Sequence, residues 1–126
     1  MLLLAADVAN KTVMVRHPKT FDVCRQAIQK CRDWLSTENI TPEVLAEYID
    51  ADEEANPWMQ ESVFRGDPDG LHALVFITLV VGHVAHNAYL HAGNANGMSE
   101  AIAEAGENIL GPMGDYGKKY GLLELI

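Results

Sequence analysis

The sequence predicts an all-α protein, a single domain over residues 1–126 that folds as a bundle of about five helices around one central apolar helix. Apolar residues recur at intervals of three and four, which is the spacing of one helix face. Two such patterns begin with a capping residue followed by proline. With 126 residues, 48% of them hydrophobic, the chain is long enough to bury a core without disulfides or metals.

Two helices are predicted in the first part of the chain, over residues 2–15 and 21–35. The first has a helical composition with weak periodicity, and it ends before Pro18, since proline restricts the residue that precedes it. Thr20 is predicted to cap the second helix. The apolar stripe of this helix steps by three, four, three and four, and consists of Phe21, Cys24, Ile28, Cys31 and Leu35.

Thr41 and Pro42 predict the start of a short helix that continues to residue 49, with Glu43 near the positive end of the helix dipole. Its predicted buried stripe consists of Val44, Leu45, Tyr48 and Ile49. We therefore expect three acidic side chains to point outward from this helix: Glu43, Glu47 and Asp50.

The central helix is predicted for residues 68–91, with Asp67 before Pro68 at its start and Gly93 at its end. Its β-branched residues also permit a buried strand, but more than twenty residues without a turn signal exceed an ordinary strand. One predicted face consists of Leu74, Ile77, Val81, Val84 and Ala88.

The last predicted helix begins after Ser99 and reaches about residue 110, with a stripe of Ile102, Ala105 and Ile109. The preceding NANG, residues 94–97, is predicted to be a loop. The glycine-rich residues 111–126 are predicted to return a terminal apolar segment to the core.

Several features favour a soluble cytoplasmic protein. Cys24 and Cys31 are seven residues apart on one predicted helix, about 10 Å, which is too far for a disulfide. Free cysteines suit a reducing compartment. The apolar N-terminus has no basic residues before it and is interrupted by Asp7, unlike a secretory signal. The longest apolar run, residues 73–82, is about half of a membrane span.

Charge is distributed unevenly along the chain. The net charge is −9, yet residues 1–35 carry six Lys/Arg against three Asp/Glu. Residues 38–69 carry ten acids and one base, Arg65. Because a negative field repels phosphate backbones and anionic lipids, nucleic acid and membranes are disfavoured as partners, and a basic protein is favoured.

The densest acidic stretch is YIDADEEANPW, residues 48–58. Five residues match the ligand positions of a calcium-binding loop: Asp50, Asp52, Glu54, Asn56 and Glu61. Such a loop also needs glycine at the position of Ala55, and Pro57 lacks the N–H that its position would use, so the match is incomplete. Two interpretations remain open, a solvated helix end and a docking surface on which charge steers the encounter and Trp58 supplies binding energy. The predicted docking residues are Glu43, Glu47, Asp50, Asp52, Glu53, Glu54, Trp58 and Glu61.

The central helix also carries a histidine stripe, His72, His83 and His86. His83 and His86 are one turn apart and could bind zinc with a carboxylate as third ligand, whereas His72 lies about 16 Å along the axis. We favour histidines that line a moderately polar face beside Phe76, Leu79 and Leu90. The alternatives are a helical metal-binding module and a small helical enzyme using this face. No nucleophile, phosphate-loop or dinucleotide motif occurs, so neither an enzyme nor a cofactor is predicted.

The stretch CRDWLSTENITPEVLAEYIDADEE, residues 31–54, followed by an apolar helix ending in AYLHAG, resembles a family of bacterial immunity proteins. It is the sixth such family catalogued in polymorphic toxin and contact-dependent growth inhibition systems, and the similarity covers about residues 20–93. The resemblance implies an all-α, non-enzymatic cytoplasmic protein that binds and neutralises the toxin encoded beside it. It implies no metal and no active-site residue.

Overall fold

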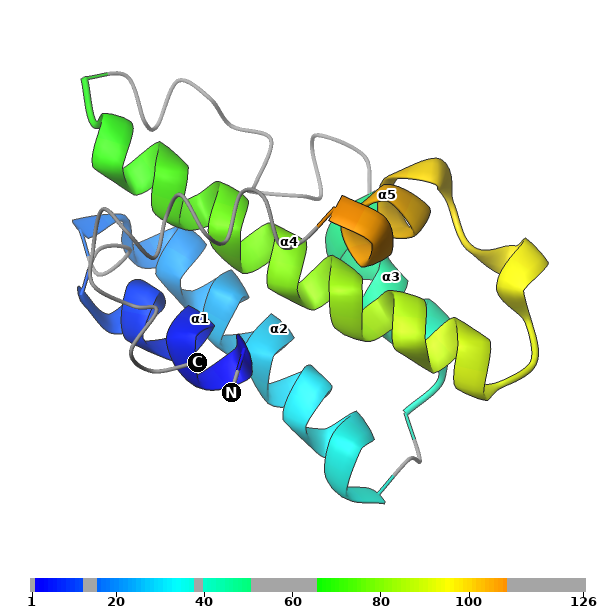
Figure 1. The fold of residues 1–126 in the computed structure, drawn as a ribbon. Coiled ribbons are helices and arrows are strands. Elements are labelled where there is room, and N and C mark those ends of the chain that lie inside the picture. Colours follow the sequence, from blue (N-terminus) through cyan, green and yellow to red (C-terminus); the bar gives the residue numbers. More distant parts are fainter. Residues whose placement is uncertain (1, 13–15, 38–39, 51–65, 109–126) are drawn as a thin grey trace.

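The computed structural model describes residues 2–12, 16–37, 40–50 and 66–108, and all structural statements below concern these residues (Figure 1). They contain five α-helices and no strand, which confirms the all-α prediction. The helices are α1 (Leu2–Thr12), α2 (Pro18–Thr37), α3 (Pro42–Asp50), α4 (Pro68–His91) and α5 (Glu100–Asn108). A short 3₁₀ helix, η4, covers Ala95–Gly97, where the sequence predicted a loop.

Helix α4 is the centre of the bundle, because α1, α2, α3 and α5 all pack against it (Figure 1). Its predicted apolar face is buried, and so is a second set of side chains beside that face: Phe76, Val80, Ala85 and Tyr89. By length and composition alone, Gly70–His91 is long and apolar enough to span a membrane. The uninterrupted apolar run of residues 73–82 is shorter, so it did not predict this. The four helices packed around α4 account for this composition.

Both ends of α4 form as the sequence predicts. The carboxylate of Asp67 accepts a hydrogen bond from the backbone N–H of Gly70 at 3.1 Å, and Pro68 occupies the first turn. At the other end Gly93 adopts a φ of +71°, a left-handed conformation that glycine tolerates best. Local chemistry at its two ends therefore sets the length of the core helix.

Helix α2 differs from the prediction at both ends. It begins at Pro18, so the prediction of Thr20 as its cap is wrong. Proline is well suited to the first position of a helix, and Thr20 instead lies buried within the first turn. Leu35 is 59% exposed rather than buried. Twenty helical residues span about 30 Å, which is longer than either α1 or α3, and in the last turn of α2 Trp34 still packs against the core whereas Leu35 faces solvent.

Helices α3 and α5 both begin at their predicted residues. In α3, Leu45 and Ala46 are buried, and the predicted stripe residues Tyr48 and Ile49 pack partly against the core. Before α5, the hydroxyl of Ser99 accepts from the backbone N–H of Ile102 at 3.3 Å, which confirms the predicted cap. The other predicted positions on α5 are Ala105, which is buried, and Ile109, which lies outside the described residues.

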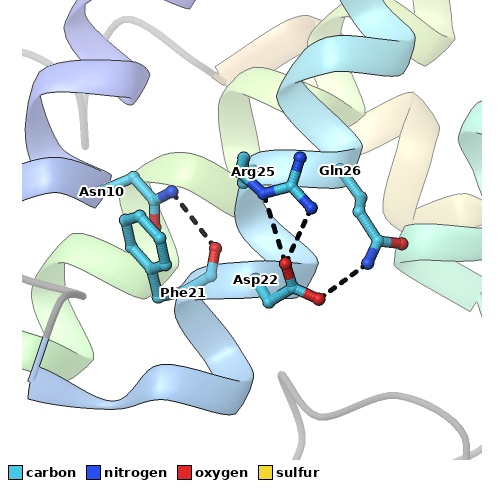
Figure 2. A network of polar contacts seen from close by, with 5 residues as sticks. All are labelled: Asn10, Phe21, Asp22, Arg25 and Gln26. Carbon is cyan, nitrogen blue, oxygen red and sulfur yellow. Dashed lines mark hydrogen bonds and ion pairs between the residues drawn. The ribbon is translucent and has the colours of Figure 1, made fainter.

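A buried side chain joins α1 to the start of α2. Asn10 is fully buried, and its amide nitrogen donates to the backbone carbonyl of Phe21 at 3.2 Å (Figure 2). The next residue, Asp22, lies on the surface and accepts hydrogen bonds from Arg25 and Gln26 (Figure 2). A polar residue inside a core normally requires such a partner, so Asn10 fixes how the two helices meet.

Gly82 lies where three helices come together. A Cβ atom placed on Gly82 would stand 2.7 Å from the Cβ of Ala105 on α5 and 4.0 Å from the Cδ1 of Ile49 on α3. The first distance is shorter than van der Waals contact permits, and the alanine methyl cannot rotate away. The absence of a side chain on α4 therefore sets how closely α5 approaches.

Gly82→Ala is expected to lower the free energy of unfolding by about 1–2 kcal/mol, because overpacking outweighs the gain in helix propensity. Denaturant unfolding followed by circular dichroism measures this. Asn87→Ala is the control, since Asn87 is exposed on the same helix. It is expected to leave stability unchanged or to raise it by a few tenths of a kcal/mol. Equal stabilisation by both substitutions would contradict the close approach of α5.

Candidate functional site

The outer side of α3 carries two uncompensated carboxylates. Glu43 and Glu47 are one turn apart and both are exposed, while Leu45 and Ala46 between them pack into the core. Among the described residues neither glutamate forms an ion pair. The side of α3 that faces away from the core is therefore negative, as the sequence predicted for these two residues.

Three basic residues of α1 and α2, Lys11, Arg25 and Arg32, form ion pairs with acids of the same two helices. Asp7 pairs with Lys11 at 2.9 Å within α1 and with Arg32 of α2 at 3.5 Å. Asp22 pairs with Arg25 at 2.8 Å (Figure 2). The hydrogen bond from Arg25, followed by that from Gln26, lowers the pKa of the Asp22 carboxyl below 3.8. These positive charges are thus engaged away from α3.

One acid of the strongly acidic region has a structural role instead. The carboxylate of Asp67 accepts from His17 Nε2 at 2.7 Å and faces Arg16 Nη2 at 3.3 Å, in addition to capping α4. The hydrogen bond from His17 is the largest cause that lowers the pKa of Asp67; the Gly70 N–H and the Arg16 charge add to it. Asp67 therefore ties the start of α4 to the residues before α2.

The remaining predicted docking residues fall where the structure gives no side-chain description. Asp50 is the last residue of α3, and its side chain is outside the described set. Five more lie within residues 51–65, which are also outside it: Asp52, Glu53, Glu54, Trp58 and Glu61. The positions matched to a calcium loop, from Asp50 to Glu61, are likewise without a described side chain. Of the predicted docking residues, the structure therefore describes the side chains of Glu43 and Glu47 only.

The histidines of α4 do not converge on a described metal site. His72 is exposed near the start of the helix, whereas His83 and His86 are half-buried towards its other end. No group of three histidine, cysteine or acidic residues within the described ranges is placed to hold a metal ion. Two imidazoles one turn apart supply fewer ligands than a structural zinc site needs.

Both cysteines are buried and free. Desolvation raises the pKa of the Cys24 thiol and that of the Cys31 thiol to about 12. Because the thiolate is the nucleophile and the metal ligand, neither cysteine supplies a reactive sulfur at neutral pH. This agrees with the prediction of two free cysteines on an apolar stripe.

An apolar surface at the ends of α2 and α4 was not assigned from the sequence. The rings of Trp34 and His91 meet edge to face, with centroids 6.0 Å apart and planes inclined at 85°. Their chain neighbours Leu35 and Leu90 are 59% and 51% exposed. The signal available was the Trp-Leu pair at the end of a helical pattern, but Leu35 continued the apolar stripe and was therefore predicted to be buried.

In a comparison with protein families, residues 1–113 match the family described as immunity protein Imm6. No curated protein and no solved structure matches the chain. The match covers all five helices, including the two exposed glutamates of α3 and the core helix.

Asp67→Asn is expected to lower the free energy of unfolding by about 1 kcal/mol at pH 6, because asparagine still caps α4 but loses the charged partner of His17 and Arg16. A carboxyl with a lowered folded pKa stabilises the fold above its ordinary value of 3.8 and loses this effect as pH falls through the folded pKa. Unfolding curves between about pH 6 and pH 2.5 should therefore converge for the two proteins.

Asp22→Asn provides the control for this pH series. Its carboxyl pKa is also lowered, but its side chain is 54% exposed, against 19% for Asp67, so solvent screens the pair. This variant should cost less stability than Asp67→Asn. A stability difference for Asp67→Asn that does not change with pH would contradict the assigned role.

Proposed function

The chain belongs to the Imm6 family of immunity proteins, and from this premise we propose that it neutralises a cognate bacterial toxin through an acidic surface that docks on a basic toxin domain. The proposed surface consists of the outer side of α3 and the acidic residues that follow it in sequence, from Glu43 to Glu61. The protein acts in the cytoplasm by binding alone. In this proposal the bound toxin domain cannot reach its substrate.

The observation that carries the proposal is that Glu43 and Glu47 are exposed and form no ion pair with any described residue. Exposed acids in most proteins are interspersed with bases, and the ten acids of residues 38–69 have a single base among them in sequence. Three described bases of α1 and α2, namely Lys11, Arg25 and Arg32, pair with Asp7 or Asp22 of the same two helices. A negative surface of this kind accelerates association with a positive partner and disfavours partners of like charge.

A toxin domain that acts on nucleic acid fits this surface best. Such a domain needs Lys and Arg side chains that bind phosphates. Carboxylates one helical turn apart on α3 can pair with the same side chains, and arginine binds carboxylate and phosphate with the same fork of N–H donors. An inhibitor of this type competes directly for the basic cleft.

A binding role also agrees with the chemistry of the described residues. The two thiols are buried and protonated, and the described histidines have no third ligand beside them. Nothing in that part of the chain favours the metal-binding or catalytic alternatives over binding. The free cysteines suit the reducing cytoplasm in which the toxin would have to be inhibited.

The first experiment expresses the toxin domain encoded beside this gene, with and without this chain, and measures survival. Purified proteins then give the association rate by stopped flow. Two variants are expected to associate about tenfold more slowly at low salt, with a flatter salt dependence, because steering charge is lost. They are Glu43→Gln/Glu47→Gln and Asp50→Asn/Asp52→Asn/Glu53→Gln/Glu54→Gln.

Glu100→Gln/Glu104→Gln is the matched control for the α3 variant. It removes the same charge from two exposed glutamates, also one turn apart, on α5. It should slow association less than the α3 variant does. If both variants slow association equally, the rate depends on the net charge of the protein and not on the position of the glutamates. That result would contradict a docking surface on α3.

Trp58→Ala is expected to leave the association rate unchanged and to accelerate dissociation by about tenfold or more, since a central aromatic residue contributes short-range contact rather than steering. Surface plasmon resonance separates the two rates. An unchanged dissociation rate would remove Trp58 from the interface while leaving the role of the acidic residues intact.

A further inference from the structure

We infer that the toxin domain also contacts an apolar surface at the C-terminal ends of α2 and α4, formed by Trp34, Leu35, Leu90 and His91 and called here the end patch. The inference rests on the proposed function and assigns a second part of the same interface. In this interface the acidic residues accelerate association, and the end patch slows dissociation. The partner that fits is a basic protein surface rich in arginine.

The end patch combines residues from the last turns of two helices that meet through one ring contact. The edge-to-face contact of Trp34 and His91, with ring centroids 6.0 Å apart, joins the last turn of α2 to the last turn of α4. Leu35 and Leu90 are the chain neighbours of these two rings, and each exposes more than half of its surface. Single exposed leucines are common on any protein, whereas two exposed leucines that are chain neighbours of one interhelical ring contact suit a binding surface.

The fold does not require leucine at either position. Both residues lie in the last turn of their helices, where a polar residue with equal helix propensity would serve. The described residues expose two other large apolar side chains, Leu71 and Val75. These lie together one turn apart at the opposite end of α4, with no aromatic pair between them among the described contacts, and they provide an internal comparison.

The end patch and the acidic side of α3 fit within one interface. Helix α2 ends at Thr37 and α3 begins at Pro42, so four residues connect them, and the five Cα-to-Cα steps span at most about 18 Å. Glu43 lies in the first turn of α3, and α2 and α3 pack against each other. An ordinary interface covers roughly 800 Å² on each partner, which is roughly 30 Å across. A single partner can therefore contact Leu35 and Glu43 together.

Arginine satisfies both parts of this surface. Its aliphatic stem can pack over Leu35 and Leu90, and its guanidinium can pair with Glu43 or stack on the ring of Trp34. A purely apolar partner would leave the glutamates of α3 without counter-charges. A basic partner without aliphatic groups to pack on the leucines would gain little binding energy from the end patch. The charge of α3 thus selects the same class of partner that the end patch can hold.

The test compares Leu35→Gln/Leu90→Gln with Leu71→Gln/Val75→Gln, each bound to the toxin domain encoded beside this gene. All four positions are exposed, so both variants should keep the unfolding midpoint of the natural chain. The end-patch variant is expected to dissociate about tenfold faster with an unchanged association rate, and the control variant less than about twofold faster.

The outcomes separate the two proposals. If the natural chain binds the toxin domain and both variants dissociate like it, the end patch is overturned and the proposed function stands. Faster dissociation of the control variant alone would overturn it as well. If sedimentation shows a dimer of the natural chain that Leu35→Gln/Leu90→Gln abolishes while toxin binding is unchanged, the patch serves a second copy instead. Failure of the natural chain to bind the toxin domain overturns both.

Discussion

Helix α4 needs apolar cover on more than one face, and the positions of the other helices follow from this need. Leu45 and Ala46 of α3 are among the residues that provide the cover, so the opposite side of α3, with Glu43 and Glu47, is directed to solvent. Gly82 admits α5 at a distance that any side chain would prevent. The orientation of the acidic helix is thus a consequence of core packing.

Charge pairing divides the molecule into two parts with different roles. In α1 and α2, Asp7 pairs with Lys11 and Arg32 and Asp22 pairs with Arg25, and such pairs stabilise the fold modestly. On α3, Glu43 and Glu47 are exposed and have no basic partner among the described residues. The proposed docking on a basic toxin domain gives such a surface a use, because opposite charge accelerates association.

Much of the fold could be predicted because its signals are local. Asp67 with Pro68, Gly93 and Ser99 each act within one turn, and they set the ends of α4 and the start of α5 where expected. The prediction for Thr20 was wrong because Pro18 offered an equally local but earlier start. Helical periodicity correctly predicted that Glu43 and Glu47 face solvent, and their docking role stays a prediction. The end patch was missed because periodicity cannot tell where a long helix leaves the core.

The sequence by itself determined the helices, the free cysteines, the negative charge and the family, since these depend on residues near one another in the chain or on composition. Only the tertiary structure decided that Asn10 bonds to Phe21, that Arg32 pairs with Asp7, and that His17 reaches Asp67 fifty positions away. The physical reason is range. Caps and periodicity act over a few residues, whereas burial and ion pairing depend on which helix faces meet.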